Sequence, residues 1–337
     1  MKFIDEAAAA EKPFFLYVAH AAPHWPLHAK ERDVAKYRGL YAENGWDRLR
    51  RERYRRVVEE GLIDGSWPLS LRDSSVPAWE KVEHKAWEAE RMAVYAAQID
   101  CMDQNVGRIL EAIHRAGIEK NTLVLFLSDN GSSHQVWKRP LDKPGAPWRH
   151  DGTPTPVGND PAIMPTLDTF VTAGPPWANV SNTPFRGYKT ECYEGGIATP
   201  LIAYWPDVIE QGNKITHQWG DIVDVIATCL DVAGAEYPRR FLGRDLLPLV
   251  GKSLLPVFQG ETRDEHESLC WNVSGNRAVR MGCWKLVSAK GKAWELYDLQ
   301  TDRTELNDLA KKHPKRVEEL SDLYQAWAKR VGIAKSQ

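Results

Sequence analysis

The feature that most constrains this sequence is an apolar run at residues 123–127 that ends in Ser128, Asp129, Asn130 and Gly131. A run of this length predicts a buried strand, and open α/β sheets build their sites where such strands end. Asp129 offers a carboxylate and Asn130 an amide oxygen, which are ligands that a hard divalent cation prefers. Gly131 permits a turn that a Cβ would oppose. The same pattern also fits a strand followed by an Asx turn without any metal.

Composition argues against several classes of protein. Of the 337 residues, 43% are hydrophobic and 27% are charged, with a formal net charge of −2, which is typical of a globular protein. This balance argues against nucleic acid or an anionic membrane as the partner. The arginine-rich residues 48–56 include Glu52 and therefore predict a solvated helix face. We find no membrane span, and the four alanines before Glu11 do not form a signal peptide.

Hydrophobic periodicity predicts an α/β body in the first part of the chain. A short helix at residues 2–11 precedes a continuously apolar stretch at 14–19, which predicts a buried strand. Helical spacing runs from residue 87 to 116, and the strand at 122–128 follows. This order of strand, helix and strand predicts a parallel sheet.

The pattern of predicted elements changes after about residue 260. Before it we expect a third strand at 200–206 and an amphipathic helix at 221–233. After it, short antiparallel strands are predicted at 277–287 and 294–298, with a closing helix from Pro314 to about residue 335. We therefore expect a main α/β domain at 1–258 and a smaller antiparallel-sheet and helix subdomain at 259–337.

Two further residues are candidates for chemistry. His24 directly follows the apolar stretch and could exchange a proton, although a loop histidine without a function is the alternative. Lys189 lies before a glycine pair at 195–196 and could bind an anionic oxygen, although an exposed surface lysine is the commoner case. A weaker polar cluster is expected from His266, Asn276 and Arg277.

Together, these elements resemble the sulfatases, specifically the arylsulfatase-type branch. The resemblance covers nearly the whole chain, in order, and is specific because five segments contribute to it. These segments are residues 13–27 around His24, 127–131, 177–186, 189–206 and 276–287, and residues 297–309 resemble the closing hairpin and tail of the family.

The resemblance implies an alkaline-phosphatase-like α/β fold and the hydrolysis of sulfuric esters. The expected fold is a mixed sheet flanked by helices, incomplete here, with a smaller C-terminal antiparallel sheet plus helix. Asp129 and Asn130 match two ligands of a calcium ion. His24 matches a histidine that helps to protonate the leaving group, and Lys189 matches a lysine on a sulfate oxygen. Such groups suit the reaction because negative charge develops on these oxygens.

The sequence departs from the family at the nucleophile. Sulfatases convert the cysteine of a C-x-(P/A)-x-R motif to formylglycine, and that motif surrounds no cysteine of this sequence. We therefore expect a C-terminal portion of a sulfatase, inactive alone, with a partial Ca²⁺ site and with the formylglycine in a missing N-terminal part. Any signal for a periplasmic or secreted location would lie there too. The cysteines are Cys101, Cys192, Cys229, Cys270 and Cys283.

Two other functions stay open at this point. A phosphatase or phosphodiesterase could use the same fold. Such a site favours zinc with histidine ligands, whereas Asn130 beside Asp129 suits calcium better. A non-catalytic protein could also keep the scaffold. The substrate is expected to be a sulfated small molecule or glycan, framed by residues 131–187 or by aromatic side chains near Trp46, Trp67 and Trp79, unless these only pack. The sequence does not indicate an oligomeric state.

Overall fold

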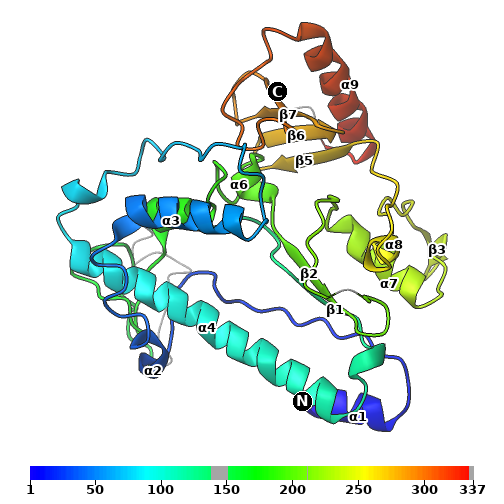
Figure 1. The fold of residues 1–337 in the computed structure, drawn as a ribbon, viewed down its shortest axis with the longest axis horizontal. Coiled ribbons are helices and arrows are strands. Elements are labelled where there is room, and N and C mark those ends of the chain that lie inside the picture. The colour runs from blue at the N-terminus through cyan, green and yellow to red at the C-terminus, as the bar shows by residue number, and fades with distance from the viewer. Residues whose placement is uncertain (138–150, 211, 334–337) are drawn as a thin grey trace. The chain divides into compact units, whose positions relative to one another are not determined.

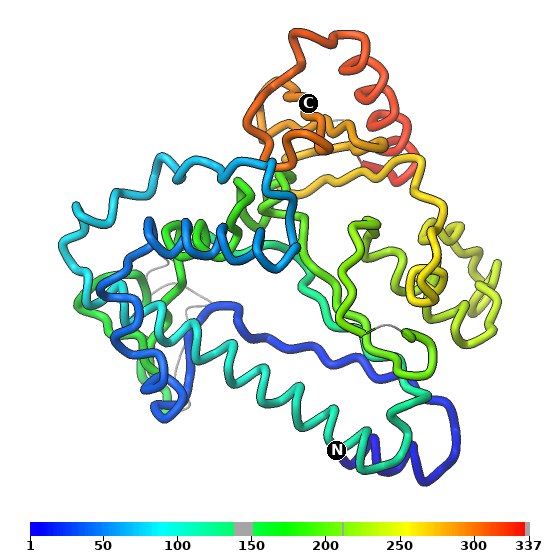
Figure 2. The backbone as a smooth tube through the Cα atoms, in the orientation of Figure 1, coloured from blue at the N-terminus to red at the C-terminus, as the bar shows by residue number. Residues whose placement is uncertain are grey.

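A computed structural model describes residues 1–137, 151–210 and 212–333, and it divides into two compact units. The first unit comprises Met1–Glu119, Asn130–Lys189 and Tyr193–Ala198. The second comprises Lys120–Asp129, Thr190–Cys192 and the chain from Thr199 onward. Figures 1 and 2 trace this path from blue to red. The domain boundary that we predicted at residue 258 stays a prediction.

The first unit is helical, and the predicted long helix is confirmed as α4 (Lys85–Arg115), drawn in cyan in Figure 1. Its C-terminus is followed by Gly117 at φ +71°, a conformation that favours glycine. Helix α2 packs on α4, and α5 packs on α3. The other helical elements are α1 (Lys2–Ala9), α2 (Glu31–Val34), α3 (Gly45–Glu59), η1 (Trp79–Lys81), α5 (Gly174–Ser181) and α6 (Glu194–Ile197).

Two hydrophobic clusters hold the first unit together. Trp46, Trp79 and Trp177 meet edge to face or tilted, and all three are buried. A second cluster packs Leu27 and Val34 on one face of α4. Leu27 also donates its backbone N–H to the carbonyl of Val171, 2.9 Å away. The loop that follows His24 is therefore anchored on both sides.

The second unit contains the strands. The strand β1 (Val124–Leu127) pairs with β2 (Leu201–Tyr204), and α7 (Val223–Val232), a small hairpin and α8 (Leu255–Phe258) follow. The predicted C-terminal sheet is confirmed as a four-stranded antiparallel meander, with α9 (Pro314–Arg330) packed on β6 and β7. The remaining elements are η2 (Glu119–Asn121), β3 (Arg240–Phe241), β4 (Arg244–Asp245), β5 (Leu269–Val273), β6 (Asn276–Met281), β7 (Trp284–Ser288) and β8 (Glu295–Asp298).

Two expectations for the N-terminal sheet are wrong. Residues 12–20 form neither helix nor strand, and Phe15 and Tyr17 are 71% and 80% exposed instead of buried. The strand β1 is only partly buried, and it pairs with β2 in an antiparallel register instead of a parallel one. A strand needs a partner for its backbone groups, and among the described residues none pairs with 14–19.

Within the described residues, no helix combines the length and the apolar character that are needed to cross a bilayer.

Candidate active site

Residues 131–134, which we call the 131–134 segment, are the centre of the candidate site in the first unit. Asn130 directly precedes the segment. Within it, the carbonyl of Ser132 accepts the backbone N–H of Lys189 at 3.0 Å. The N–H of Ser132 donates to Oδ1 of Asn182 at 2.8 Å, and Asn182 also donates to the carbonyl of Gly187. The segment thus fixes the loop that carries Lys189.

The same segment contacts the loop of His24. Nε1 of Trp25 donates to Oγ of Ser133 at 3.4 Å. From the other side, Nε2 of Gln98 on α4 donates to the carbonyl of His24 at 3.1 Å. Asn130 and Lys189 are therefore linked to this short segment through the backbone, and the loop of His24 is linked to it through the Trp25 side chain. His24 and Lys189 are 165 positions apart in the sequence. The structure thus brings together the chain segments that carry these three predicted residues, whose roles stay predictions.

Gly131 packs directly on the turn at α6. Its N–H donates to the carbonyl of Gly196 at 3.0 Å. A Cβ at Gly131 would lie 1.8 Å from the carbonyl oxygen of Gly195, which no side chain tolerates. A Cβ at Gly195 would in turn meet the carbonyl of Arg186 at 2.3 Å. These glycines therefore allow the close approach of three backbone segments.

His24 is exposed, and one hydrogen bond defines the chemistry of its ring. Nδ1 lies 2.7 Å from the carbonyl oxygen of Trp25. Since a carbonyl only accepts, Nδ1 must carry a proton and donate it. Nε2 is then the nitrogen that takes up or releases a proton, and it makes no hydrogen bond with the described residues. This is the arrangement that a general acid needs.

Lys189 is held by backbone contacts on both sides. The first is its own N–H bond to Ser132. The second is at Thr190, whose carbonyl accepts Nδ2 of Asn276 at 2.6 Å. Thr190 has φ +75°, which is a strained backbone conformation for a β-branched residue. Asn276 also accepts the N–H of Lys290 at 2.9 Å, so it bridges two loops of the second unit.

The polar cluster expected from His266, Asn276 and Arg277 consists of separate contacts. His266 lies 2.7 Å from the buried carboxylate of Asp224, while Arg277 stacks on Trp294. Asp224 also accepts Nη2 of Arg263 at 2.8 Å and two backbone N–H groups. This network ties α7 to the segment that precedes β5, so His266 has a structural partner that sequence reasoning missed.

Asp129 and Asn130 offer side-chain oxygens, which are the ligand atoms that a hard cation prefers. Asp129 is exposed and offers a carboxylate, and Asn130 is half-buried. Nδ2 of Asn130 donates to the carbonyl of Gly131 at 2.9 Å. Calcium binds six to eight oxygens, so these two residues would supply a minority of them. Among the described residues, no group of three His, Cys, Asp or Glu side chains could hold a metal ion.

The aromatic residues near His24 differ from the ones that we expected. Trp46 and Trp79 are core residues, which confirms that they pack. Trp25 instead contacts Trp137 and Phe170, with ring centroids 5.6 and 5.4 Å away. All three rings are partly exposed. The position of Trp25 next to His24 was the sequence signal for this aromatic group, and the other two come from distant loops.

The cysteines have the wrong environment for a nucleophile. Burial raises the pKa of the Cys192 thiol to about 11 and that of the Cys270 thiol to about 12. A reactive cysteine needs the opposite shift, because the thiolate is the reactive form. This agrees with the absence of the formylglycine motif around each cysteine.

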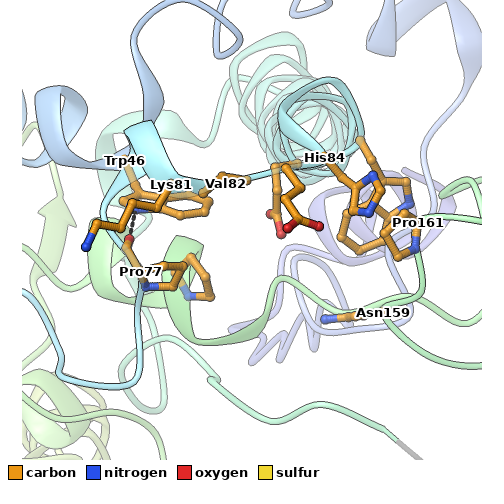
Figure 3. A pocket seen from close by; sticks show the side chains of 11 residues that line it. Trp46, Pro77, Lys81, Val82, His84, Asn159 and Pro161 are labelled. Atoms are coloured by element: carbon orange, nitrogen blue, oxygen red, sulfur yellow. Dashed lines mark hydrogen bonds between the residues drawn. The ribbon is translucent and has the colours of Figure 1, made fainter.

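A separate pocket of about 320 Å³ lies in the first unit (Figure 3). Trp46 and Pro77 border one end, where Nε1 of Trp46 donates to the Pro77 carbonyl at 2.8 Å, and His84 and Pro161 border the other. Its lining includes Glu88, whose carboxylate is bound by Arg91 and Trp177. The predicted catalytic and metal residues His24, Asp129, Asn130 and Lys189 do not line this pocket.

Comparison with known proteins agrees with the resemblance of the sequence. Against solved structures, Ps i-CgsB matches with a TM-score of 0.60 at 21% identity, over 97% of this chain and 52% of that one. The phosphonate monoester hydrolase of Agrobacterium radiobacter matches with a TM-score of 0.53 at 16% identity, over 98% of this chain and 59% of that one. These likenesses confirm the alkaline-phosphatase-like α/β fold.

Sequence relatives point to the same family. An uncharacterized sulfatase of Schizosaccharomyces pombe is 32% identical, over 98% of this chain and 61% of the relative. The arylsulfatase of Klebsiella aerogenes is 31% identical, over 78% of this chain and 55% of the relative. The chain thus spans little more than half the length of these relatives. The family model described as N-sulphoglucosamine sulphohydrolase, C-terminal matches residues 188–328, and the Sulfatase model matches residues 1–235. The chain belongs to the sulfatase family.

Proposed function

We propose that this chain supplies His24, Lys189 and Asn130 to the hydrolysis of sulfate esters. The observation that supports the proposal is that Asn130 directly precedes the 131–134 segment, while the Lys189 backbone and the Trp25 side chain next to His24 both contact it. The family membership of the chain supports the same reaction class. The chemistry of the three side chains also fits, because Lys189 offers a cation, His24 a proton donor and Asn130 a neutral oxygen.

Lys189 and His24 have distinct tasks in this proposal. Hydrolysis increases the negative charge on the oxygen that leaves with the alcohol, and the peripheral oxygens of the sulfate carry charge throughout. Lys189 binds a peripheral oxygen and stabilises that charge. His24 delivers a proton from Nε2 to the leaving oxygen, while its Nδ1–H stays bonded to the carbonyl of Trp25.

Two components of the reaction are not supplied by the described residues. The nucleophile is expected to be a formylglycine, which no cysteine of this sequence provides. Calcium, held in part by Asp129 and Asn130, would act as a Lewis acid on a sulfate oxygen. We therefore propose that this chain carries a C-terminal portion of the catalytic machinery.

The names of the relatives support two classes of substrate. One relative is an arylsulfatase, and another is the N-acetylgalactosamine-6-sulfatase of Mus musculus, which is 31% identical over 77% of this chain. We propose a sulfated small molecule or glycan as the substrate. The aromatic rings of Trp25, Trp137 and Phe170 could contact the organic part of either.

Binding of a sulfate ester tests the proposal without requiring turnover. We expect 4-nitrophenyl sulfate to bind the unmodified chain in an NMR titration, and Lys189→Met to weaken it about tenfold or more, because a charged hydrogen bond is lost. Lys292→Met is the matched control, since Lys292 is exposed in the second unit. The proposal is wrong if the ester does not bind, or if both variants bind it equally.

A further inference from the structure

His134 is a polar residue of the 131–134 segment that neither the sequence analysis nor the proposed function uses. It lies two residues beyond Ser132, whose carbonyl holds the N–H of Lys189. Its ring stacks on the ring of Tyr188, with centroids 4.7 Å apart and planes inclined by 29°. Tyr188 directly precedes Lys189. The His134 ring therefore packs on the residue next to the proposed sulfate-binding lysine, and the backbone two residues before His134 is bonded to that lysine.

The ring on which His134 stacks is itself immobilised. Tyr188 is buried, and its hydroxyl donates to Oδ2 of Asp73 at 3.0 Å. The other oxygen of Asp73 accepts the N–H and the hydroxyl of Ser75 at 2.8 and 2.6 Å. Burial alone would raise the pKa of Asp73, but hydrogen bonds from Ser75 and Tyr188 outweigh it and keep this pKa low. The carboxylate stays ionised at neutral pH, so it continues to accept the hydrogen bond that holds the Tyr188 ring under His134.

The two ring nitrogens of His134 have different surroundings. Nδ1 is enclosed and has no hydrogen-bond partner among the described residues. A proton on Nδ1 would be a buried donor without an acceptor, which is unfavourable. The neutral ring therefore carries its proton on Nε2. Nε2 is not among the enclosed atoms and makes no hydrogen bond with the described residues. Nε2–H can therefore donate a hydrogen bond to a ligand.

We propose that His134 is a specificity residue whose Nε2–H donates a hydrogen bond to a hydroxyl group of the substrate alcohol. This inference rests on the proposed function, in which Lys189 binds the sulfate. Lys189 meets the sulfate in that proposal, and an imidazole N–H donates readily to a hydroxyl oxygen of the alcohol. Sites that hydrogen-bond a substrate hydroxyl discriminate against analogues without one. The substrate class that fits is therefore a sulfated sugar in preference to a simple aryl sulfate.

Two probes and two variants test the assignment. The probes are galactose 6-sulfate, which has hydroxyl groups, and 4-nitrophenyl sulfate, which has none. We expect His134→Asn to weaken the binding of galactose 6-sulfate about three- to tenfold, which is the usual effect of losing one neutral hydrogen bond. The binding of 4-nitrophenyl sulfate should not change. His134→Gln, whose amide nitrogen reaches close to the place of Nε2, should recover part of the loss.

The tautomer of the unmodified chain provides an independent readout. Long-range ¹H–¹⁵N NMR should show the neutral His134 ring protonated on Nε2, and protonation on Nδ1 would overturn the assignment. Equal effects of His134→Asn on both probes, or no effect on either, would overturn it as well. In these cases Lys189→Met would still weaken both probes, so the proposed function would stand. If neither probe binds the unmodified chain, both proposals fail.

Discussion

Gly131 has a different role from the one that its sequence context suggested. We expected a turn that needs a glycine conformation, but its φ is not in the positive range. The requirement is for space, because a Cβ would collide with the carbonyl of Gly195. Sequence alone could not show this, since the colliding turn lies 64 residues further along the chain. The residue nevertheless lies shortly after the end of strand β1, as the pattern predicted.

Replacing Gly131 by alanine should therefore destabilise the first unit. The added Cβ must displace backbone atoms, so we expect a loss of about 3 kcal/mol in the free energy of unfolding and a loss of sulfate-ester binding. Gly107 on α4 is the matched control, because a Cβ there meets nothing within 4 Å. Gly107→Ala should stabilise by up to about 1 kcal/mol. Urea unfolding followed by circular dichroism separates the two, and equal effects would contradict the packing argument.

Asp224 makes the stability of the second unit depend on pH in the acidic range. Burial would raise its pKa, but hydrogen bonds from two backbone N–H groups and from Arg263 outweigh this and lower it. The unfolded carboxyl has its ordinary pKa, about 3.9. The stabilising contribution is thus complete above pH 4 and is lost as the pH falls through the lower pKa of the folded state.

We expect the free energy of unfolding to decrease below pH 4, and Asp224→Asn to reduce that dependence. At neutral pH the substitution should cost about 3 kcal/mol, because it leaves Arg263 buried without its counter-ion. Asp245→Asn is the control, since the side chain of Asp245 is 84% exposed. Denaturant titrations between pH 2 and 7 give the comparison. The same acid dependence in wild type and Asp224→Asn would show that other carboxylates cause it.

At the scale of elements, local sequence patterns located helices and hairpins correctly, but they did not show which distant segments pair as strands. The helix α4 and the hairpin of β6 and β7 depend on neighbours in sequence, so periodicity and turn residues such as Gly282 located them. Residues 14–19 have the composition of a strand, but whether a strand forms depends on a partner elsewhere. The helix α5 was missed because prolines and glycines hide its period, and its core contact through Trp177 comes from α3.

The unpaired stretch at residues 14–19 should promote self-association. Six uncharged residues with high β-propensity leave Phe15 and Tyr17 exposed, which is the pattern of an aggregating edge. Tyr17→Lys should lower the apparent mass at high concentration in light scattering. Leu71→Lys is the control, because Leu71 is equally exposed, at 83%, but isolated in a polar loop. If both variants reduce association to the same extent, general charge is the cause instead of this stretch.

The C-terminal sheet depends on a buried ion pair. Nζ of Lys285 on β7 lies 2.8 Å from Glu305, and the side chains are 1% and 0% exposed. Removing one partner leaves a buried charge, so Lys285→Met should cost about 3 to 5 kcal/mol in the free energy of unfolding. The double variant with Glu305→Leu should recover most of that loss. A double variant as unstable as the sum of the single ones would show that the pair has no coupling.

At the scale of the whole molecule, the chain passes from one unit to the other at both ends of residues 130–189. Residues 130–189 belong to the first unit, while Asp129 before them and Thr190 after them belong to the second. Asn130 and Lys189 are thus the first and last residues of one stretch. The sequence predicted each residue through its motif, but it could not predict this division, which depends on how distant segments pack.

The chain as a whole should bind calcium weakly and should not hydrolyse sulfate esters. Asp129 and Asn130 provide few of the oxygens that calcium needs, so calorimetry should give a dissociation constant above about 1 mM. Because no cysteine can become the formylglycine, 4-nitrophenyl sulfate should not be hydrolysed above background even with calcium present. Micromolar calcium affinity would mean that other ligands complete the site. Hydrolysis that disappears in Lys189→Met would mean that this chain holds a nucleophile of its own.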